Sequence, residues 1–327
     1  MRRIEAGSYY TYLTEGCRLC RRGSKLVLFI TGLCRENCFY CPISFERKGK
    51  DVIYANERRV KRIEDFYTEL EMMDAEGVAI TGGEPLLKLG RLVEYLRISK
   101  KIDLHVHIYT SIPANERLLS KIKIVDEIRF HPPELRNPER YYEPIKTAKR
   151  FGIEVGIEIP AIKFEEKIVE IVNELDVFLN VNQLEASESN WSELVKRGFQ
   201  IKDYFVENPD VIKMYERANK FHYCSARFKD VAQFRRRLLR MAMNQPEFYK
   251  VTRDGTIVCC RIEGNLDEAE KILQRRGYNY SRFEDCIETS PELNRNVRED
   301  LKSKGLKLSI VERYPTANRT IIELTEI

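Results

Sequence analysis

Several features common in other protein classes are missing from this sequence of 327 residues. No run of about 18 or more apolar residues occurs, so we expect no membrane-spanning helix. The first residues, MRRIEAGSYYTYL, lack the apolar stretch of a secretory signal peptide, so we expect a cytoplasmic protein. Internal repeats and low-complexity tracts are absent as well, which argues against a repeat architecture.

What the chain has in quantity is charge and core-forming residues. Hydrophobic residues make up 43%, enough for a sizeable core, and charged residues make up 33%. A high charged fraction is common in proteins from hot environments, so the composition suggests a thermophile. The net charge of +5 is compatible with a nucleic-acid partner but does not require one.

Cysteine is abundant for a chain of this kind. Nine cysteines occur, and an odd number fits poorly with a fully paired disulfide framework. Thiols in the cytoplasm stay reduced. The cysteines therefore indicate metal ligation more than disulfides.

Strand-like and helix-like segments alternate over the first 200 residues. Each strand-like run is short, apolar and rich in β-branched residues, and a helical pattern follows it. Six such units in sequence predict a parallel sheet with right-handed crossovers, curled into a partial (β/α)6 barrel of the TIM type. The predicted strands are residues 25–32, 77–83, 102–111, 127–132, 152–160 and 178–185.

Three parts follow from this pattern. Residues 1–24 form an N-terminal extension, residues 25–200 form the barrel, and residues 201–327 form an α+β appendage. The appendage begins with a basic amphipathic helix over 228–242 and continues with a hairpin that turns at Asp254-Gly255. In a barrel of this kind, functional residues lie at the carboxyl ends of the strands.

A compact cysteine motif follows the first predicted strand. The stretch TGLCRENCFYCPIS contains Cys34, Cys38 and Cys41, spaced C-x3-C-x2-C, without a fourth ligand nearby. Structural zinc normally takes four ligands, whereas three thiolates can hold a [4Fe–4S] cluster and leave one iron open. A zinc knuckle or an unrelated cluster site is the alternative.

The motif, with Tyr40 before its last cysteine, resembles the signature of the radical S-adenosylmethionine (SAM) superfamily. The resemblance implies that the open iron binds the amino and carboxylate groups of SAM. It further implies reductive cleavage of SAM to a 5′-deoxyadenosyl radical, with electrons from a donor of the reduced ferredoxin or flavodoxin type. The cofactor then carries the chemistry and the protein positions it.

A second motif, ITGGEP, ends the second predicted strand at the place of the superfamily's Gly-Gly-Glu segment. Gly82 and Gly83 would let the backbone approach the cofactor closely, and Glu84 would accept from its ammonium group. The resemblance implies further cofactor contacts for Tyr40 with the adenine, for Ser111 and His131 with the ribose and carboxylate, and for Glu158 beside the adenine. Gln183 and Glu185 would face the cofactor or the substrate. A solvated strand end is the alternative for Glu158.

Four further ligands are spread over both ends of the chain. Cys17 and Cys20 form C-x2-C, and FHYCS adds His222 and Cys224, so together they predict a second site for zinc or an auxiliary iron–sulfur cluster. Ordinary buried thiols are the alternative. Because Cys17 and Cys20 precede the first strand, this site would lie far from the SAM cluster unless the N-terminus folds back.

The remaining candidate ligands are interpreted as packing residues. Cys259 and Cys260 are adjacent on a strand and face opposite sides, and Cys286 is expected to be inert. His105 and His107 share a strand face and can bind a metal, but a packed or solvated role is the prediction.

Three functions remain open at this point. The first is a radical SAM enzyme that modifies a macromolecule such as RNA, which the basic helix would contact. The second is a glycyl-radical activase or a peptide- or protein-modifying enzyme, since the layout resembles a largely archaeal group related to pyruvate formate-lyase activating enzyme. The third is a non-catalytic iron–sulfur or zinc-binding protein.

Overall fold

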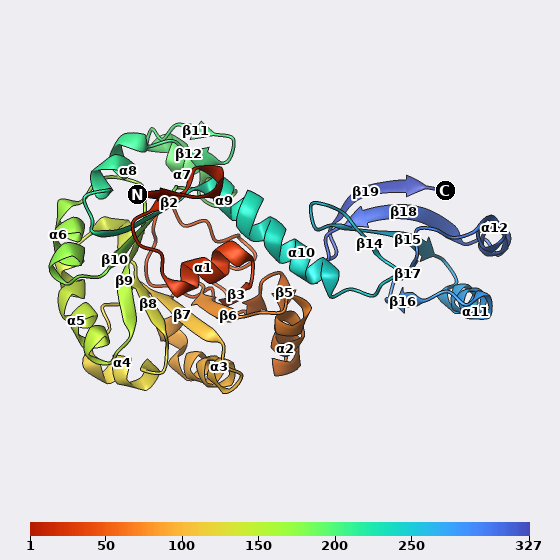
Figure 1. The fold of residues 1–327 in the computed structure, drawn as a ribbon, viewed down its shortest axis with the longest axis horizontal. Helices are drawn as coiled ribbons and strands as arrows, with labels where there is room; N and C mark the ends of the chain where they lie inside the picture. The colour runs from red at the N-terminus through yellow and green to blue at the C-terminus, as the bar shows by residue number, and fades with distance from the viewer. The chain divides into compact units, whose positions relative to one another are not determined.

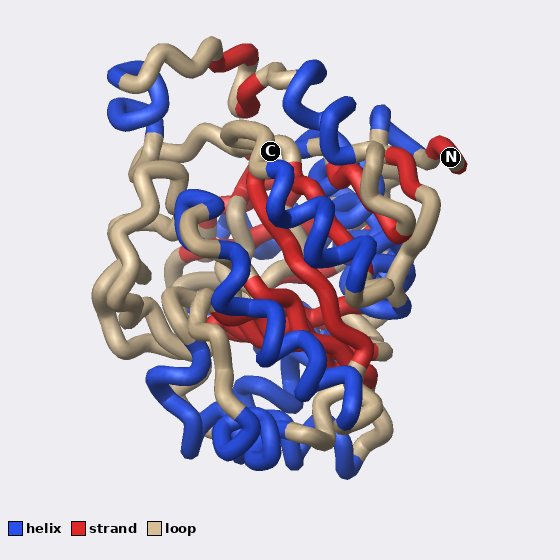
Figure 2. Tube along the Cα trace, turned by 90° about the vertical axis from the view of Figure 1, so that its left-hand side faces the viewer, coloured by secondary structure: helices blue, strands red, loops and turns tan.

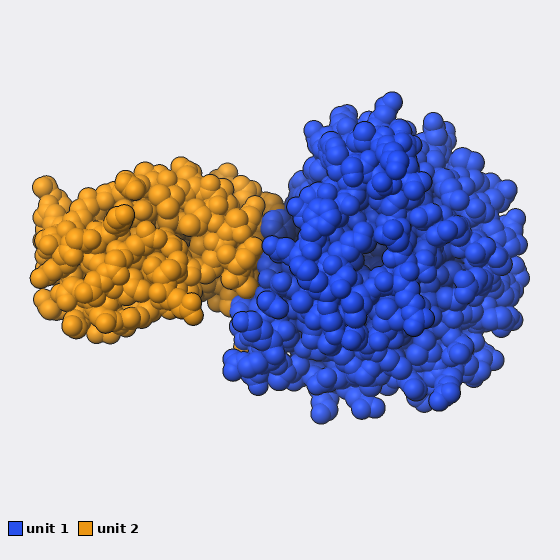
Figure 3. Space-filling view, turned by 180° about the vertical axis from the view of Figure 1, so that it is seen from behind, with its two compact units in different colours: residues 1–70, 75–234 blue, residues 71–74, 235–327 orange.

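The computed structural model describes all 327 residues and divides them into two compact units (Figure 3). Unit 1 comprises residues 1–70 and 75–234, and unit 2 comprises residues 71–74 and 235–327. No helix is long and apolar enough to span a bilayer. The division after residues 24 and 200 that the sequence suggests stays a prediction.

Unit 1 is a partial barrel of parallel strands, which confirms the predicted fold class. Its strands run in the order β13-β10-β9-β8-β7-β6-β3. Seven strands are parallel rather than six, because Lys220–Cys224 pairs parallel to the last predicted strand. The strands are β3 (Lys25–Phe29), β6 (Gly77–Thr81), β7 (His105–Thr110), β8 (Glu127–Phe130), β9 (Glu154–Pro160), β10 (Phe178–Asn182) and β13 (Lys220–Cys224).

Helices cover the outside of this barrel, and the strands lie within them (Figures 1 and 2). Local sequence signals set the helix ends: Asn115, for example, caps α4 by accepting from the Leu118 N–H at 3.0 Å. The helices are α2 (Ile63–Met72), α3 (Leu89–Lys101), α4 (Glu116–Ile122), α5 (Tyr142–Arg150), α6 (Glu166–Glu174), α7 (Trp191–Lys196) and α8 (Pro209–Tyr215).

Short antiparallel strands cover both edges of the barrel sheet. β2 (Tyr9–Tyr10) pairs with β13 and with β1 (Arg2–Arg3). At the other edge, β4 (Tyr54–Ala55) pairs with β3 and with β5 (Arg58–Arg59). These additions leave no long unpaired strand at either edge.

Helix α1 (Glu15–Arg22) lies over the centre of the ring of strands in the view of Figure 1 and contacts β3, β6 and β7. Thr14 caps it by accepting from the Cys17 N–H at 3.2 Å, and Gly23 ends it at φ 71°. A Cβ on Gly16 would lie 2.5 Å from both the Glu127 Oε2 and the His107 Nδ1 atoms, so only glycine allows this approach. The N-terminal extension therefore folds back against the end where the strands begin.

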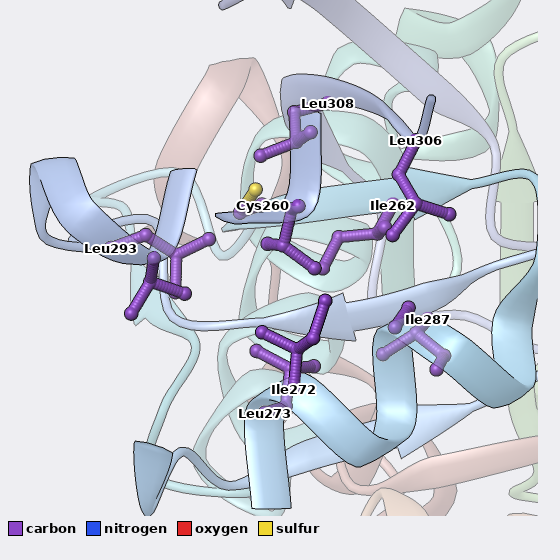
Figure 4. Packing of buried hydrophobic residues seen from close by; sticks show 11 residues of the cluster. Cys260, Ile262, Ile272, Leu273, Ile287, Leu293, Leu306 and Leu308 are labelled. Atoms are coloured by element: carbon purple, nitrogen blue, oxygen red, sulfur yellow. The ribbon is translucent and has the colours of Figure 1, made fainter. Parts of the chain in front are cut away.

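Unit 2 is built on an antiparallel sheet in the order β16-β17-β15-β18-β19, with β14 also paired to β15. Helix α11 packs on this sheet through Ile272 and Leu273, which meet Ile262 and Ile287 of the strands (Figure 4). Val297 and Leu301 of α12 belong to the same buried cluster. The predicted hairpin is present, but the sequence interpretation missed α11. The elements are α10 (Arg235–Met243), β14 (Lys250–Val251), β15 (Ile257–Glu263), α11 (Leu266–Arg276), β16 (Tyr280–Arg282), β17 (Ile287–Thr289), α12 (Arg295–Ser303), β18 (Lys307–Arg313) and β19 (Ile321–Glu326).

Candidate cofactor site at the carboxyl ends of the strands

The three cysteines of the motif lie in the loop that follows β3. Cys34 is exposed, Cys38 and Cys41 are partly exposed, and all three are free thiols. The Cys34 sulfur accepts from the Glu36 N–H at 3.4 Å, and the Cys41 N–H donates to the Cys38 carbonyl at 3.1 Å. The three residues line one cavity of about 320 Å³. Three accessible thiols at one cavity suit a [4Fe–4S] cluster with an open iron.

The ends of the neighbouring strands supply the other walls of this cavity. Seven of the nine residues predicted to contact the cofactor or substrate line it, namely Tyr40, Gly82, Gly83, Ser111, His131, Gln183 and Glu185. Their individual roles stay predictions, but the structure brings them together. Glu84 and Glu158 are placed differently.

Gly82 and Gly83 are required by the backbone of the cysteine loop. A Cβ on Gly82 would lie 2.3 Å from the Thr31 carbonyl oxygen, and one on Gly83 would lie 2.3 Å from the Leu33 carbonyl oxygen. The Gly83 N–H also donates to the Thr31 carbonyl at 2.7 Å. The structure thus shows a close approach to the loop that carries the cysteines, and the close approach to the cofactor stays a prediction.

Gly83→Ala is therefore expected to push this loop away from β6 and to lower cluster incorporation at least about tenfold, since the neighbouring atoms are backbone. Iron per chain after anaerobic reconstitution measures the effect. Gly90→Ala is the matched control, because a Cβ there meets no atom within 4 Å. Full iron content in Gly83→Ala would show that the close approach does not position the loop.

Glu84 is 2% exposed and is held by the end of β7. One carboxylate oxygen accepts from the Thr110 hydroxyl at 2.8 Å and the Leu86 N–H at 3.0 Å. The other accepts from the Ser111 N–H and hydroxyl, each at 2.7 Å. Glu84 therefore fixes the end of β7 beside the cavity. Its predicted contact with the ammonium group of SAM would need a further hydrogen bond to one of these two carboxylate oxygens.

Tyr40 and His131 form a hydrogen-bonded pair in the cavity wall. The Tyr40 hydroxyl lies 2.9 Å from His131 Nε2 and accepts from the Glu134 N–H at 2.8 Å. His131 Nδ1 lies 2.9 Å from the Glu158 carbonyl oxygen. Burial raises the pKa of Tyr40 far above its usual value and lowers the pKa of His131. Both rings are therefore uncharged near neutral pH.

Glu158 points into the barrel and not into solvent, so the alternative of a solvated strand end is wrong. Its carboxylate accepts from Arg129 at 2.7 Å, Asn180 at 3.0 Å and Asn182 at 2.7 Å. Burial raises the pKa of Glu158, but these three donors outweigh burial and leave the pKa below its usual value. Glu158 is thus a charged group inside the barrel, held by Arg129, Asn180 and Asn182.

Other contributors were missed by sequence reasoning. The Asn190 amide donates to the Tyr40 carbonyl at 2.9 Å, and the Ser189 hydroxyl donates to the Cys41 carbonyl at 3.2 Å. Both residues lie in the loop after β10, so this loop braces the cysteine loop. Lys229, which pairs with Glu185, lines the cavity as well. No motif marks these residues, because their contacts are set by how the loops meet.

The four residues of the predicted second metal site all lie in unit 1, and two of them meet. The Cys17 sulfur is 3.6 Å from His222 Nδ1, and Arg129 donates to the same sulfur at 3.3 Å. A different set of residues, His105, His107 and Glu127, has its possible ligand atoms within 4.8 Å of one another. The four-residue site stays a prediction.

Comparison with solved structures finds matches at low sequence identity and low TM-score. SuiB of Streptococcus suis, solved with S-adenosylmethionine, is 13% identical with a TM-score of 0.43; the match covers 62% of this chain and 50% of that chain. A domain of pyruvate-formate lyase-activating enzyme from Bacteroides vulgatus is 14% identical with a TM-score of 0.34, covering 46% of this chain and 99% of that chain. The chain thus spans about half the length of SuiB.

Sequence comparison gives a stronger relationship. A proposed glycyl-radical enzyme activating enzyme from Methanocaldococcus jannaschii is 38% identical over 95% of this chain and 92% of its own length. Residues 255–327 match a domain of unknown function, DUF8061. Residues 28–198 match the radical SAM superfamily, and this region holds the three cysteines and the barrel. The chain belongs to the radical SAM superfamily and is a radical SAM enzyme.

Proposed function

We propose that this enzyme activates a glycyl-radical enzyme by abstracting a hydrogen atom from a glycine of that partner. The proposal rests on the relative from Methanocaldococcus jannaschii, a proposed glycyl-radical enzyme activating enzyme that is 38% identical over 95% of this chain. A match over nearly the full length of both proteins includes unit 2 and the N-terminal segment, and so goes beyond the shared barrel.

The residues of the site fit the cofactors that this reaction needs. Cys34, Cys38 and Cys41 would hold a [4Fe–4S] cluster as thiolates, and the ends of β6, β7 and β8 would bind SAM. When bound, the cluster and SAM supply the electron and the 5′-deoxyadenosyl radical. The protein's own share is to hold the cysteine loop in place through Gly83, Ser189 and Asn190.

The reaction also needs an electron donor, and we expect an acidic one of the ferredoxin or flavodoxin type. Arg35, Arg136 and Arg140 line a second cavity of about 460 Å³, together with Glu36 from the cysteine loop. Basic side chains beside a redox centre favour association with an acidic carrier. Raising the salt concentration should therefore slow reduction by such a carrier but not by dithionite.

Modification of RNA is less well supported than activation of a protein. The RNA hypothesis was based on the basic helix of the appendage. Two arginines of α10 in this helix, however, form ion pairs within unit 2. Arg235 pairs with Asp254 at 3.3 Å, and Arg240 pairs with Asp74 at 3.1 Å. Charges already paired with carboxylates contribute less to phosphate binding.

The test uses reconstituted enzyme, SAM and dithionite with a purified glycyl-radical enzyme of the same organism. We expect an electron paramagnetic resonance signal of a glycyl radical on the partner, and we expect 2-deuterated glycine in the partner to change its splitting. Cleavage of SAM without a radical on any glycyl-radical partner would contradict the activase proposal. Label transfer from SAM to RNA instead would favour the RNA alternative.

A further inference from the structure

A cluster of ligand side chains lies in the barrel of unit 1 at the end opposite to the cysteine loop. His105 is the first residue of β7 and Glu127 is the first residue of β8, whereas the cysteines follow the last residue of β3. A strand of five or six residues separates the two ends by roughly 15–20 Å. The cluster is therefore outside the cofactor site.

His107 is buried among polar groups and lacks a partner for its ring. Its exposed fraction is 0%, and neither Nδ1 nor Nε2 has a hydrogen-bond partner. A buried ring nitrogen without a partner is costly, and native proteins seldom retain one without a reason. A metal ion bonded to one of these nitrogens would supply the missing interaction.

Glu127 has one oxygen committed and one directed at the histidines. Oε1 accepts from Arg129 Nε at 2.5 Å. Oε2 accepts a weak bond from the Gly16 N–H at 3.2 Å and lies 3.9 Å from His105 Nε2. Arg129 in turn is shared with Glu158, so the carboxylates balance the local positive charge.

The ligand atoms of His105, His107 and Glu127 all lie within 4.8 Å of one another. Two ligand atoms bonded to one zinc ion at about 2.1 Å each can be at most about 4.2 Å apart, so side-chain shifts of under about 1 Å would complete the site. Gly16 leaves the space between His107 Nδ1 and Glu127 Oε2 open, since any side chain there would fill it.

We propose that His105, His107 and Glu127 bind a zinc ion that ties the beginning of β7 to the beginning of β8, beside Gly16 of helix α1. Two imidazoles and one carboxylate form a common zinc ligand set, with a fourth position left for water. This site is distinct from the one predicted at Cys17, Cys20, His222 and Cys224, because it uses no sulfur.

The experiment measures zinc in the full chain, reconstituted anaerobically and supplied with zinc chloride. We expect about one zinc per chain, with nitrogen and oxygen neighbours at about 2.0–2.1 Å in zinc-edge X-ray absorption and no sulfur shell at about 2.3 Å. His107→Phe and Glu127→Gln are expected to weaken zinc binding at least about tenfold. Cys17→Ser and His222→Phe are the controls and should bind zinc as the wild type does.

A second readout separates loss of zinc from loss of folding. Each variant should retain its [4Fe–4S] absorption, and a chelator should lower the Tm of the wild type but not that of Glu127→Gln. His105→Gln, at a less buried position, gives the same comparison if His107→Phe does not fold. A sulfur shell, zinc retained in the ligand variants, or no zinc in the wild type would each overturn the proposal.

Discussion

Replacing Cys38 with alanine is expected to abolish the [4Fe–4S] cluster and to lower 5′-deoxyadenosine formation by at least about a thousandfold. The reason is that Cys34 and Cys41 alone leave a cluster with two protein thiolates instead of three. Iron and sulfide per chain, together with product formed from SAM and dithionite, measure the effect. Cys38 is partly exposed in a loop, so its loss should not unfold the barrel.

Cys286→Ala is the matched control. Cys286 is also a free thiol, but it is buried in unit 2, outside the cysteine loop. The Cys286→Ala variant should keep the iron content and the 5′-deoxyadenosine formation of the wild type. SAM cleavage that survives in Cys38→Ala would remove this cysteine from the cluster and contradict the assignment of the site.

Replacing Arg129 with methionine is expected to destabilise unit 1 by about 3–5 kcal/mol, which is the loss typical of a buried ion pair deprived of one partner. Arg129 is 3% exposed. Its guanidinium donates to Glu127 at 2.5 Å, to Glu158 at 2.7 Å and to the Thr14 hydroxyl at 3.2 Å. Without it, two carboxylates inside the barrel lose their common counter-charge.

Chemical denaturation monitored by circular dichroism measures this change. Arg150→Met serves as the control, because Arg150 is 64% exposed in its pair with Glu116 and such pairs contribute little. We expect a change of under about 0.5 kcal/mol for that variant. If Arg129→Met lowered the free energy of unfolding by less than about 1 kcal/mol, Arg129 would not be the counter-charge that stabilises Glu127 and Glu158 inside the barrel.

The barrel and the cluster site could be predicted from sequence because both depend on local signals. Short β-branched runs mark buried parallel strands wherever they occur. The spacing of Cys34, Cys38 and Cys41 places three thiols in one loop whatever surrounds it. Gly82 and Gly83 were also found by motif, and the structure adds their close approach to the cysteine loop.

What escaped prediction depends on how distant segments meet. Helix α1 is short and rich in arginine, so nothing in its sequence indicates contact with β3, β6 and β7 of the barrel. Its position brings Gly16 against Glu127 and His107, which are separated from it by about a hundred residues. The seventh strand, Lys220–Cys224, was missed because it has only five residues, contains Lys220 and His222, and lacks the β-branched residues that mark the other strands. His105 and His107 were set aside because Glu127 could not be placed beside them.

The most direct test of the central claim is the yield of 5′-deoxyadenosine from the anaerobically reconstituted full chain after addition of SAM and dithionite, measured together with its iron content. The account predicts about four irons held by the cysteine loop, besides any zinc, and 5′-deoxyadenosine that depends on both SAM and reductant. A chain that takes up its full iron but neither binds nor cleaves SAM would contradict the account.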